Sequence, residues 1–343
     1  MKEGAGGFRV AVVGATGLVG EAMIECLKTR EFPVGEIVLL ASERSAGTVV
    51  KFGDQQVTVK DLADFDFAGV DIALFSAGGS VSREHAPRAA AAGAMVIDNT
   101  SCFRYDDDVP LVVPEVNPGA LAGARVRNII ANPNCSTIQM VVALKPIYDA
   151  VGIRRINVAT YQSVSGAGRR VLEDLARQTA LLMNGRPLEE MATPKQIAFN
   201  ALPHIDQFED NGYTREEMKM AWETRKIFSD PEIAVNATAV RIPVFFGHSE
   251  AVHIETGDRI TAAEARKLLK KAPGIKVMDE RRPGGYPTAA TEGSGSDAVW
   301  VGRIREDISH DRGLNLWVVS DNIRKGAALN SVQIAETFLK SYL

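Results

Sequence analysis

The sequence predicts an α/β protein of two domains, with a Rossmann-like parallel sheet in the first and a mixed sheet, in an α+β arrangement, in the second. At 343 residues the chain is too long for one ordinary core and suits two. Short apolar strands alternate with amphipathic helical segments in the first third, and from about Ile156 the strands become longer. A glycine-rich turn joins the first strand to the first helix.

The first region reads as βαβ units around a parallel sheet with helices on both faces. The strands expected here are Phe8–Val13, Ile37–Ala41, Asp71–Ser76, Ala94–Asp98 and Val126–Ala131. The helices expected here are Glu21–Thr29 and Ser82–Ala92.

The second region predicts an open mixed sheet with helices on one side. Its expected strands are Ile156–Gln162, Ala234–Val244, Ala251–Glu255, Ala298–Arg305 and Leu314–Ser320. Its expected helices are Arg169–Asn184, Arg215–Phe228 and Thr261–Lys271, the last opening with a capping box of Thr261 and Glu264. The Gly284–Ser296 stretch is a predicted loop, and Lys325–Leu343 is a predicted amphipathic helix that returns to the first domain.

Composition argues for small-molecule partners. The 39 Lys and Arg against 43 Asp and Glu leave a formal charge of -4, which predicts neither a nucleic acid nor a membrane as partner. No apolar run approaches the roughly 18 residues that span a bilayer, and Met1–Phe8 lacks the pattern of a signal peptide. Three cysteines cannot form a disulfide framework and fit a reducing compartment, so we expect a cytoplasmic protein.

The Gly14–Gly20 turn is the first candidate binding site. It follows the predicted strand Phe8–Val13 and opens a helix, the order that places a pyrophosphate on a helix N-terminus. Its spacing is G-x-x-G-x-x-G and not G-x-G-x-x-G, so a plain turn is the alternative.

The residues that follow the predicted strand Ile37–Ala41 bear on the choice between NAD and NADP. An NAD site usually has a carboxylate here for the ribose 2′-hydroxyl. Arg44 and Ser45 can instead hold a 2′-phosphate, since the arginine fork donates two parallel hydrogen bonds, and we expect NADP. Glu43 could serve a ribose hydroxyl, and a solvated charged loop is the other alternative.

Cys135 is the candidate nucleophile. It lies between an apolar strand and the apolar helical run Ile138–Leu144, so it falls near a helix N-terminus, where the dipole and backbone N–H groups favour a thiolate. We interpret Cys26 and Cys102 as buried small hydrophobes.

His248 is the candidate partner of the thiol, because a turn glycine should present it at a strand end and leave it unburied. Arg241 is expected seven residues earlier on the same strand. The glycine loop after Gln162 could place an amide and backbone donors in a cleft. The remaining histidines are interpreted as structural: His85, His204, His253 and His310.

These motifs, together with the closing Val319–Ala328 segment, resemble the aspartate-semialdehyde dehydrogenase family along essentially the whole chain. The resemblance implies an NADP-binding domain at 1–134, completed by a helix at 323–343, and a catalytic and dimerisation domain at 135–322. A homodimer is expected, with a tetramer as the alternative. No metal ion is expected.

The resemblance also implies residue roles. Cys135 would be the nucleophile and His248 the acid/base. The substrate would be held by Gln162, Arg241 and Glu216, and phosphate by Arg104 and Lys219, with Glu217 and Lys226 left open as alternatives to the Glu216–Lys219 pair. The implied NADP contacts are Gly14, Thr16, Gly17, Leu18, Val19, Arg44, Ser45, Ser165, Gly166 and Asn322. For Arg104, a surface salt bridge with Asp106–Asp108 is the alternative.

The implied reaction is the NADPH-dependent reduction of 4-phospho-L-aspartate to L-aspartate 4-semialdehyde and phosphate through a cysteine thioester, reversible, in lysine, methionine and threonine biosynthesis. One alternative is N-acetyl-γ-glutamyl-phosphate reductase, which uses the same chemistry on a longer substrate. The other is a catalytically silent NADP-binding homologue, since fold alone does not establish activity.

Overall fold

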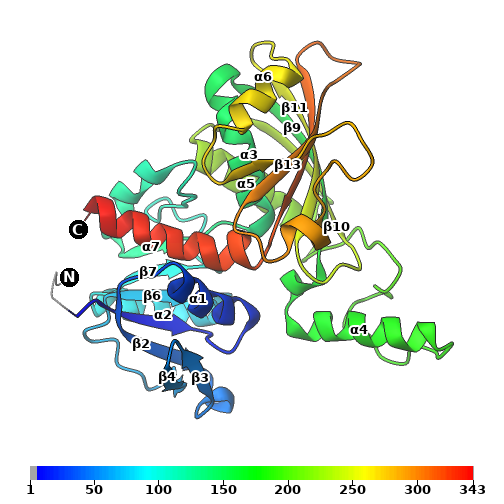
Figure 1. Ribbon diagram of the computed structural model, residues 1–343. Helices are drawn as coiled ribbons and strands as arrows, with labels where there is room; N and C mark the ends of the chain where they lie inside the picture. The colour runs from blue at the N-terminus through cyan, green and yellow to red at the C-terminus, as the bar shows by residue number, and fades with distance from the viewer. Residues whose placement is uncertain (1–5, 343) are drawn as a thin grey trace. The chain divides into compact units, whose positions relative to one another are not determined.

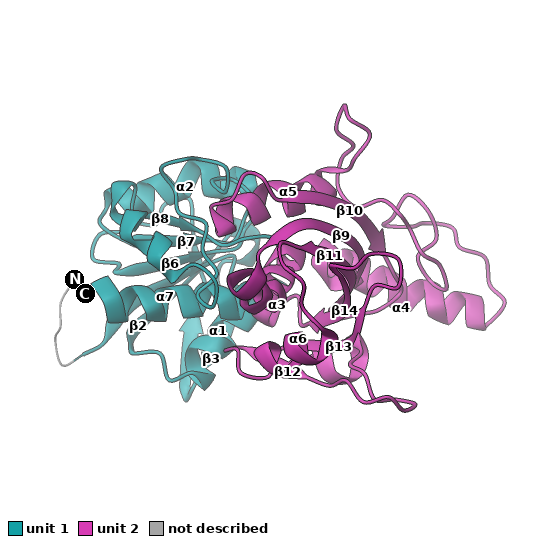
Figure 2. Ribbon diagram, turned by 90° about the horizontal axis from the view of Figure 1, so that it is seen from above, with its two compact units in different colours: residues 1–134, 327–343 teal, residues 135–326 magenta. Residues whose placement is uncertain are grey.

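The chain forms two compact units, one of which contains both ends of the chain (Figure 2). The computed structural model describes residues 6–342 of the 343. Unit 1 comprises residues 1–134 and 327–343, and unit 2 comprises residues 135–326. The chain therefore returns to unit 1 after Gly326, where the sequence had suggested Asn322.

Unit 1 is built on a six-stranded parallel sheet (Figure 1). In spatial order its strands are β5 (Lys60–Asp61), β2 (Val34–Ala41), β1 (Phe8–Val13), β6 (Ile72–Phe75), β7 (Met95–Asp98) and β8 (Ile129–Ala131). Because β1 has β2 on one side and β6 on the other, the strand order reverses beside β1, the position where doubly wound sheets bind ligands. The predicted Rossmann-like class is confirmed. A small hairpin of β3 (Val49–Phe52) and β4 (Gln55–Thr58) was not predicted.

The helices of unit 1 cover this sheet. They are α1 (Leu18–Thr29), α2 (Gly79–Ala91) and the C-terminal α7 (Leu329–Tyr342). One buried apolar cluster combines side chains of β1, α1 and α7, including Val12, Leu27 and Phe338. Arg30, the residue after α1, donates two hydrogen bonds of 2.6 and 2.7 Å to Glu336 of α7. The last helix is thereby part of the unit 1 core although 192 residues of unit 2, 135–326, precede it.

Unit 2 is built on a six-stranded mixed sheet. In spatial order its strands are β10 (Ala234–Arg241), β9 (Ile153–Gln162), β11 (His248–Thr256), β14 (Gly313–Ser320), β13 (Val299–Glu306) and β12 (Ile275–Val277). Its helices are α3 (Cys135–Val151), α4 (Arg169–Met183), α5 (Arg215–Phe228) and α6 (Ala262–Leu269). Helix α3 packs against β9, β11, β13 and β14. Its residues 136–144 are all buried, because a helix that is apolar on nearly every side is stable only in the protein interior.

Several strand ends meet at one edge of the unit 2 sheet. β9 and β10 are parallel, and Gln162 at the end of one pairs with Arg241 at the end of the other. β11 runs antiparallel between β9 and β14, so that its first residue, His248, pairs with Ser320, the last residue of β14. The carboxyl ends of three strands and the start of a fourth therefore lie together.

The predicted strand Ala234–Val244 is too long. β10 ends at Arg241, because Pro243 has no N–H for a strand ladder and Gly247 turns the chain with φ +84°. A new antiparallel strand then begins at His248. The expectation that Arg241 and His248 share a strand is wrong, and the two residues reach the same sheet edge on separate strands.

Three further elements differ from expectation. The predicted strand Val126–Ala131 begins only at Ile129, because Pro118–Val126 forms a 3-10 helix. The predicted loop Gly284–Ser296 contains a π-helical turn at Ala289–Gly293. The C-terminal helix is preceded by another π-helical turn, Arg324–Ala328, and Leu343 lies outside the described residues, as does Met1–Ala5 at the other end. Within residues 6–342, no helix is long and apolar enough to cross a membrane.

We expect Gly20→Ala to destabilise unit 1. A Cβ at this position would lie well inside contact distance of the Gly14 carbonyl oxygen, and backbone cannot move aside as a side chain can. Overpacking of this kind costs about 1–3 kcal/mol. The measurement is the thermal unfolding midpoint, which should fall by several degrees. The matched control is Gly123→Ala, whose Cβ would meet no atom within 4 Å. Equal midpoints for the two variants would contradict the steric argument.

Candidate active site

Cys135 is the first residue of α3, and its sulfur contacts a histidine. The Sγ atom lies 3.3 Å from Nε2 of His248. The thiol is partly exposed, whereas residues 136–144, which follow it in α3, are buried. A sulfur at a helix N-terminus and within hydrogen-bond distance of an imidazole has the two neighbours that favour a thiolate.

His248 is fully buried, contrary to the expectation that its turn would leave it unburied. It does begin a strand as expected, but that strand is central in the sheet, with β9 on one side and β14 on the other. The pKa of His248 is lowered to about 3, chiefly by burial and also by the Arg241 guanidinium, while the Glu216 carboxylate and a backbone hydrogen bond to Gly247 act in the opposite direction. The imidazole is therefore neutral at physiological pH.

Arg241 lies against the same imidazole, at the end of β10. Its side chain is 8% exposed, and one Nη donates a 2.6 Å hydrogen bond to the Ser163 carbonyl. Burial lowers its pKa, while Glu216 and Cys135 raise it. A Cβ on Gly166 would lie 3.2 Å from Nη1 of Arg241 and 3.5 Å from the His248 ring. The glycine loop after Gln162 therefore comes directly against both side chains.

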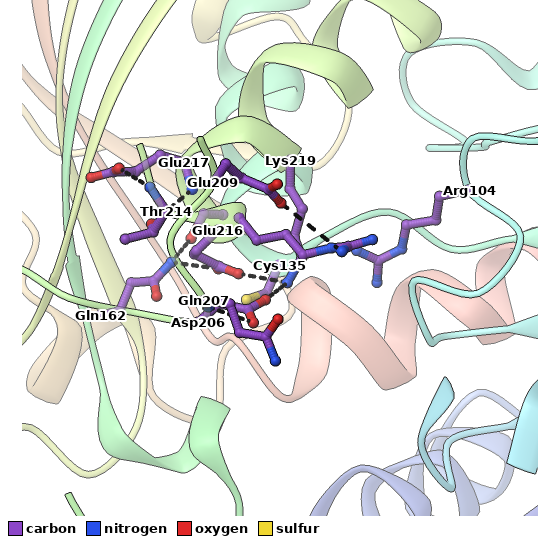
Figure 3. Close-up of polar contacts among 12 residues, drawn as sticks. Arg104, Cys135, Gln162, Asp206, Gln207, Glu209, Thr214, Glu216, Glu217 and Lys219 are labelled. Carbon is purple, nitrogen blue, oxygen red and sulfur yellow. Dashed lines mark hydrogen bonds and ion pairs between the residues drawn. The ribbon is translucent and has the colours of Figure 1, made fainter. Parts of the chain in front are cut away.

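A chain of polar contacts runs from Gln162 to Lys219 (Figure 3). The amide of Gln162 donates to the hydroxyl of Ser136 and, at 3.1 Å, to Glu216. Glu216 also accepts a 3.0 Å bond from Lys219, which donates a second one of 2.7 Å to Asp206. Burial acts to lower the pKa of Lys219, but the Glu216 and Asp206 carboxylates together raise it above its ordinary value. Glu216 thus connects the amide and the ammonium.

The two neighbouring glutamates of α5 have different surroundings. Glu217 forms the capping box of α5 with Thr214, and it also accepts a 2.9 Å bond from the backbone of Ala239. The carboxylate oxygens of Glu217 therefore accept hydrogen bonds from backbone N–H groups, whereas the carboxylate of Glu216 contacts the side chains of Gln162 and Lys219. Lys226 lies seven residues beyond Lys219 on the same helix.

Several residues at this edge were not expected from the sequence. Ser136 and Asp206 are partners of Gln162 and Lys219. The backbone N–H of Ser163 donates to Nδ1 of His248 at 3.1 Å. A Cβ on Gly326 would lie 2.8 Å from the Cβ of Cys135, so only glycine fits beside the nucleophile there. None of these residues has a sequence pattern of its own, although Gly326 lies within the closing Val319–Ala328 segment.

Asn322 connects the loops at this edge. Its Oδ1 accepts bonds of 3.0 Å from the Ser163 hydroxyl and 2.9 Å from the backbone of Gly247. Its Nδ2 donates to the Ser165 hydroxyl at 3.0 Å. Asn322 and Ser165, both expected to contact NADP, are thus hydrogen-bonded to one another.

Arg104 belongs to unit 1. Its guanidinium donates a 2.9 Å bond to the carbonyl of Asn99, the residue after β7. The side chain of Asn99 accepts a 2.6 Å bond from Asn132, which fixes the turn that carries the arginine. The carboxylates of Asp106 and Asp108 pair with Arg127, at 2.8 and 3.2 Å.

The glycine turn of unit 1 has the shape expected for a nucleotide loop. Gly14 has φ +87°, and a Cβ there would lie 2.5 Å from the Ser76 carbonyl oxygen at the end of the neighbouring strand β6. Gly17 is the N-cap of α1 and offers no side chain to the first backbone N–H groups. Thr16 precedes this N-cap, and Leu18 and Val19 are the first two residues of α1. The turn can thus accept a pyrophosphate on the helix dipole.

The second strand ends where a ribose is expected in this fold. Gly14 and Ala15 both donate to the Leu40 carbonyl near the end of β2, at 2.8 and 3.1 Å. A 3-10 turn, Glu43–Ser45, follows immediately, and the side chain of Arg44 is exposed. Both Glu43 and Arg44 are therefore in the segment that follows β2, beside the glycine turn.

Two family models match the chain. Residues 9–124 match the semialdehyde dehydrogenase NAD binding domain, and residues 144–325 match the semialdehyde dehydrogenase dimerisation domain. The second match lies within unit 2 and identifies it as a dimerisation domain of this family. This agrees with the expected homodimer.

Individual relatives match over nearly the whole length. An aspartate-semialdehyde dehydrogenase of Legionella pneumophila is 63% identical, over 98% of this chain and 97% of the relative. The crystal structure of aspartate semialdehyde dehydrogenase II of Vibrio cholerae, complexed with ASA, is 60% identical with a TM-score of 0.96, over 98% and 99% of the two chains. An enzyme of Candida albicans with NADP is 26% identical with a TM-score of 0.75, over 97% and 98%. The chain belongs to the aspartate-semialdehyde dehydrogenase family of oxidoreductases.

Proposed function

We propose that this chain catalyses the reversible NADPH-dependent reduction of 4-phospho-L-aspartate to L-aspartate 4-semialdehyde and phosphate, with Cys135 as the nucleophile. The observation that carries the proposal is the 3.3 Å contact between Sγ of Cys135 and Nε2 of His248, at a sheet edge that also holds Arg241 and Gln162. A thiol, a hydrogen-bonding imidazole, a buried cation and an amide suit acyl transfer from an amino-acid acyl phosphate.

Arg241 is the proposed receptor for the α-carboxylate of the substrate. It is a buried guanidinium whose planar fork matches a carboxylate with two parallel hydrogen bonds. Gln162 and Glu216 lie within 3.1 Å of one another and present an amide and a carboxylate, which suit a substrate with a carbonyl oxygen and an ammonium group.

The chemistry begins with attack of the Cys135 thiolate on the acyl carbon. A carbon–sulfur bond forms, the bond from carbon to the phosphate oxygen breaks, and the substrate remains on the enzyme as a thioester. Arg104 and Lys219 are the proposed phosphate ligands, and each balances charge on the departing group.

NADPH, when bound, supplies the hydride that reduces the thioester. The carbonyl oxygen then carries a negative charge, and His248, the proposed acid/base, can supply a proton or a hydrogen bond to it. Collapse of this oxyanion breaks the carbon–sulfur bond, releases the aldehyde and restores the thiolate of Cys135.

The residues of unit 1 fit the proposed cofactor. Gly14 leaves room where a Cβ would meet Ser76, and α1 begins at the same turn without a capping side chain. The expected pyrophosphate ligands are therefore the backbone groups of Thr16, Gly17, Leu18 and Val19. Arg44 and Ser45 are the proposed ligands of the 2′-phosphate, and Ser165, Gly166 and Asn322 are further proposed NADP contacts.

The proposed setting is the cytoplasmic route from aspartate to lysine, methionine and threonine, with a homodimer as the working assembly and a tetramer as the alternative. The relatives favour this activity over N-acetyl-γ-glutamyl-phosphate reductase, since those described above are all aspartate-semialdehyde dehydrogenases. A silent homologue is disfavoured by the joint presence of Cys135, Gln162, Arg241 and His248.

The proposed activity is tested by phosphate-dependent oxidation of aspartate semialdehyde with NADP. Wild type should turn over, and Cys135→Ala should not, because the nucleophile is lost while the cofactor turn is untouched. NADP binding by the variant should remain, measured by titration calorimetry. A control for thiol loss in general is Cys26→Ala, which removes a buried cysteine of α1. Near-native turnover of Cys135→Ala would refute the mechanism.

A second prediction concerns the phosphate ligand. Arg104→Met should raise the phosphate concentration needed for half-maximal rate at least about tenfold, because a charge-assisted bond is worth about 1.5–3 kcal/mol. The semialdehyde requirement should change much less. The measurement is initial rate against phosphate at saturating semialdehyde and NADP. Arg127→Met is the matched control, since that arginine pairs with Asp106 and Asp108. An unchanged phosphate dependence would transfer the phosphate site to Lys219 or Lys226.

A third prediction concerns cofactor choice. Wild type should prefer NADP to NAD. Arg44→Ala should reduce that preference mainly by weakening the binding of NADP, because only NADP has a 2′-phosphate that accepts hydrogen bonds from the guanidinium. The measurement is the ratio of kcat/KM for the two cofactors before and after mutation. Lys51→Ala, another exposed cation of unit 1, is the control. If wild type prefers NAD, then Glu43 and not Arg44 serves the ribose.

A further inference from the structure

Two asparagines follow the neighbouring parallel strands β7 and β8 of unit 1. Asn99 comes directly after β7, and Asn132 comes directly after β8. Because the two strands are parallel neighbours, both residues lie at the carboxyl edge of the sheet. Nδ2 of Asn132 donates a 2.6 Å hydrogen bond to Oδ1 of Asn99. The side chains thereby join the two strand ends, in addition to a 2.8 Å backbone bond from Asn132 to Asp98.

A third asparagine extends this contact into the C-terminal helix. Asn330 is the second residue of α7 and, like Asn132, it is fully buried. Its Nδ2 donates a 2.6 Å bond to Oδ1 of Asn132 and a 3.1 Å bond to the backbone carbonyl of Val112. Asn330, Asn132 and Asn99 thus form a continuous series of side-chain amides, called the amide chain below.

The backbone fixes the direction of each bond in the amide chain. A carbonyl oxygen can only accept, so the Asn330 atom that faces Val112 is the nitrogen. The same nitrogen faces Asn132, which must therefore present its oxygen there and its nitrogen to Asn99. That nitrogen of Asn132 also lies 3.4 Å from the carbonyl of Pro133, a second atom that can only accept. Turning over any one amide would place like groups face to face.

Asn99 connects the amide chain to Arg104. The backbone carbonyl of Asn99 accepts a 2.9 Å bond from Nη2 of Arg104, whose side chain is only 6% exposed. The donors of a guanidinium lie in one rigid plane, so a carbonyl that holds one of them sets the direction of the others. A displacement of Asn99 would therefore turn the whole Arg104 guanidinium.

The turn after β7 has a second anchor outside the amide chain. Oδ1 of Asp98 accepts a 2.8 Å bond from the Ser82 hydroxyl of α2 and a 3.0 Å bond from the backbone of Thr100. Oδ2 of Asp98 accepts a 2.8 Å bond from the Thr100 hydroxyl. The turn should therefore remain folded when the amide chain is broken, and the loss should appear in the position of its Asn99 carbonyl.

We propose that Asn330 and Asn132 are positioning residues for phosphate, which act through Asn99 to hold the Arg104 guanidinium in its phosphate-binding orientation. The proposal rests on the proposed function, in which Arg104 is a phosphate ligand. Charge-assisted bonds from arginine to phosphate depend on the orientation of the fork, so a small rotation weakens them. The C-terminal helix α7 thus contributes to phosphate affinity as well as to the core of unit 1.

The first test is Asn330→Ala, which removes the donors at the start of the amide chain. The phosphate concentration for half-maximal rate should rise about three- to tenfold, the range for one lost hydrogen bond, while kcat and the semialdehyde and NADP requirements change less than about twofold. The matched control is Ser331→Ala, the next residue of α7, which is also buried and donates to the Ala327 carbonyl of its own helical segment. A fall in kcat, or an equal rise in all three requirements, would overturn the proposal.

The second test asks whether the effect passes through Arg104. In an Arg104→Met background, Asn330→Ala should change the phosphate requirement by less than about twofold, because residues of one network are not additive. Full additivity of the two changes would contradict the proposal. Slower alkylation of Cys135 in Asn330→Ala would also contradict it, since the amide chain would then act on the nucleophile through Asn132 and Pro133.

Direct phosphate binding separates this inference from the proposed function. Inorganic phosphate is titrated by calorimetry into the NADP-bound wild type, Asn330→Ala and Ser331→Ala, without semialdehyde and without turnover. The affinity should fall about threefold or more in Asn330→Ala alone. This pattern in an enzyme that fails to oxidise aspartate semialdehyde would refute only the proposed function. Turnover by wild type together with equal phosphate affinities in the three proteins would refute only the role of the amide chain.

Discussion

The arrangement of β11 between β9 and β14 is the constraint on which the rest of the site depends. β11 runs antiparallel to both strands, so its first residue, His248, meets residues from the ends of β9 and β14. A shift of one residue in this register would turn every side chain of β11 to the opposite face of the sheet. His248 would then point away from Cys135, whose position is set independently by α3.

This edge of the unit 2 sheet contains charged side chains, among them Glu216 and Arg241, that are buried from solvent. Buried ions are tolerated when they are paired and hydrogen-bonded. Glu216 meets this condition through Gln162 and Lys219, and Lys219 meets it through Glu216 and Asp206. Arg241 donates to a backbone carbonyl and also lowers the pKa of His248. The cation that suits a substrate carboxylate thus acts in the same direction as burial, which is the main cause of the lowered pKa of the neighbouring imidazole.

Much of this organisation could be predicted from the sequence. The βαβ alternation, the Gly14–Gly20 turn and the position of Cys135 at a helix start all follow from local patterns, and the fold class is confirmed. The surroundings of His248 could not be predicted, because Pro243 and Gly247 convert one apparent strand into two and periodicity does not show which strand lies centrally. Burial of a histidine is decided by its sheet neighbours, and these are distant in sequence.

Gly326 shows why some requirements of the site have no local signal. After β14 pairs with β11, the chain continues through Asp321 and Asn322 and passes Cys135 so closely that a Cβ at residue 326 would lie 2.8 Å from that of the cysteine. Glycine is therefore required at position 326 by Cys135, which lies 191 positions earlier in the chain (326 minus 135). Its own backbone conformation does not require glycine, because its φ is not positive. Since β14 also positions Asn322 against Ser163, one strand sets both the space around the sulfur and the loop that orients the imidazole. The nucleophile and its histidine partner therefore depend on the same tertiary contact.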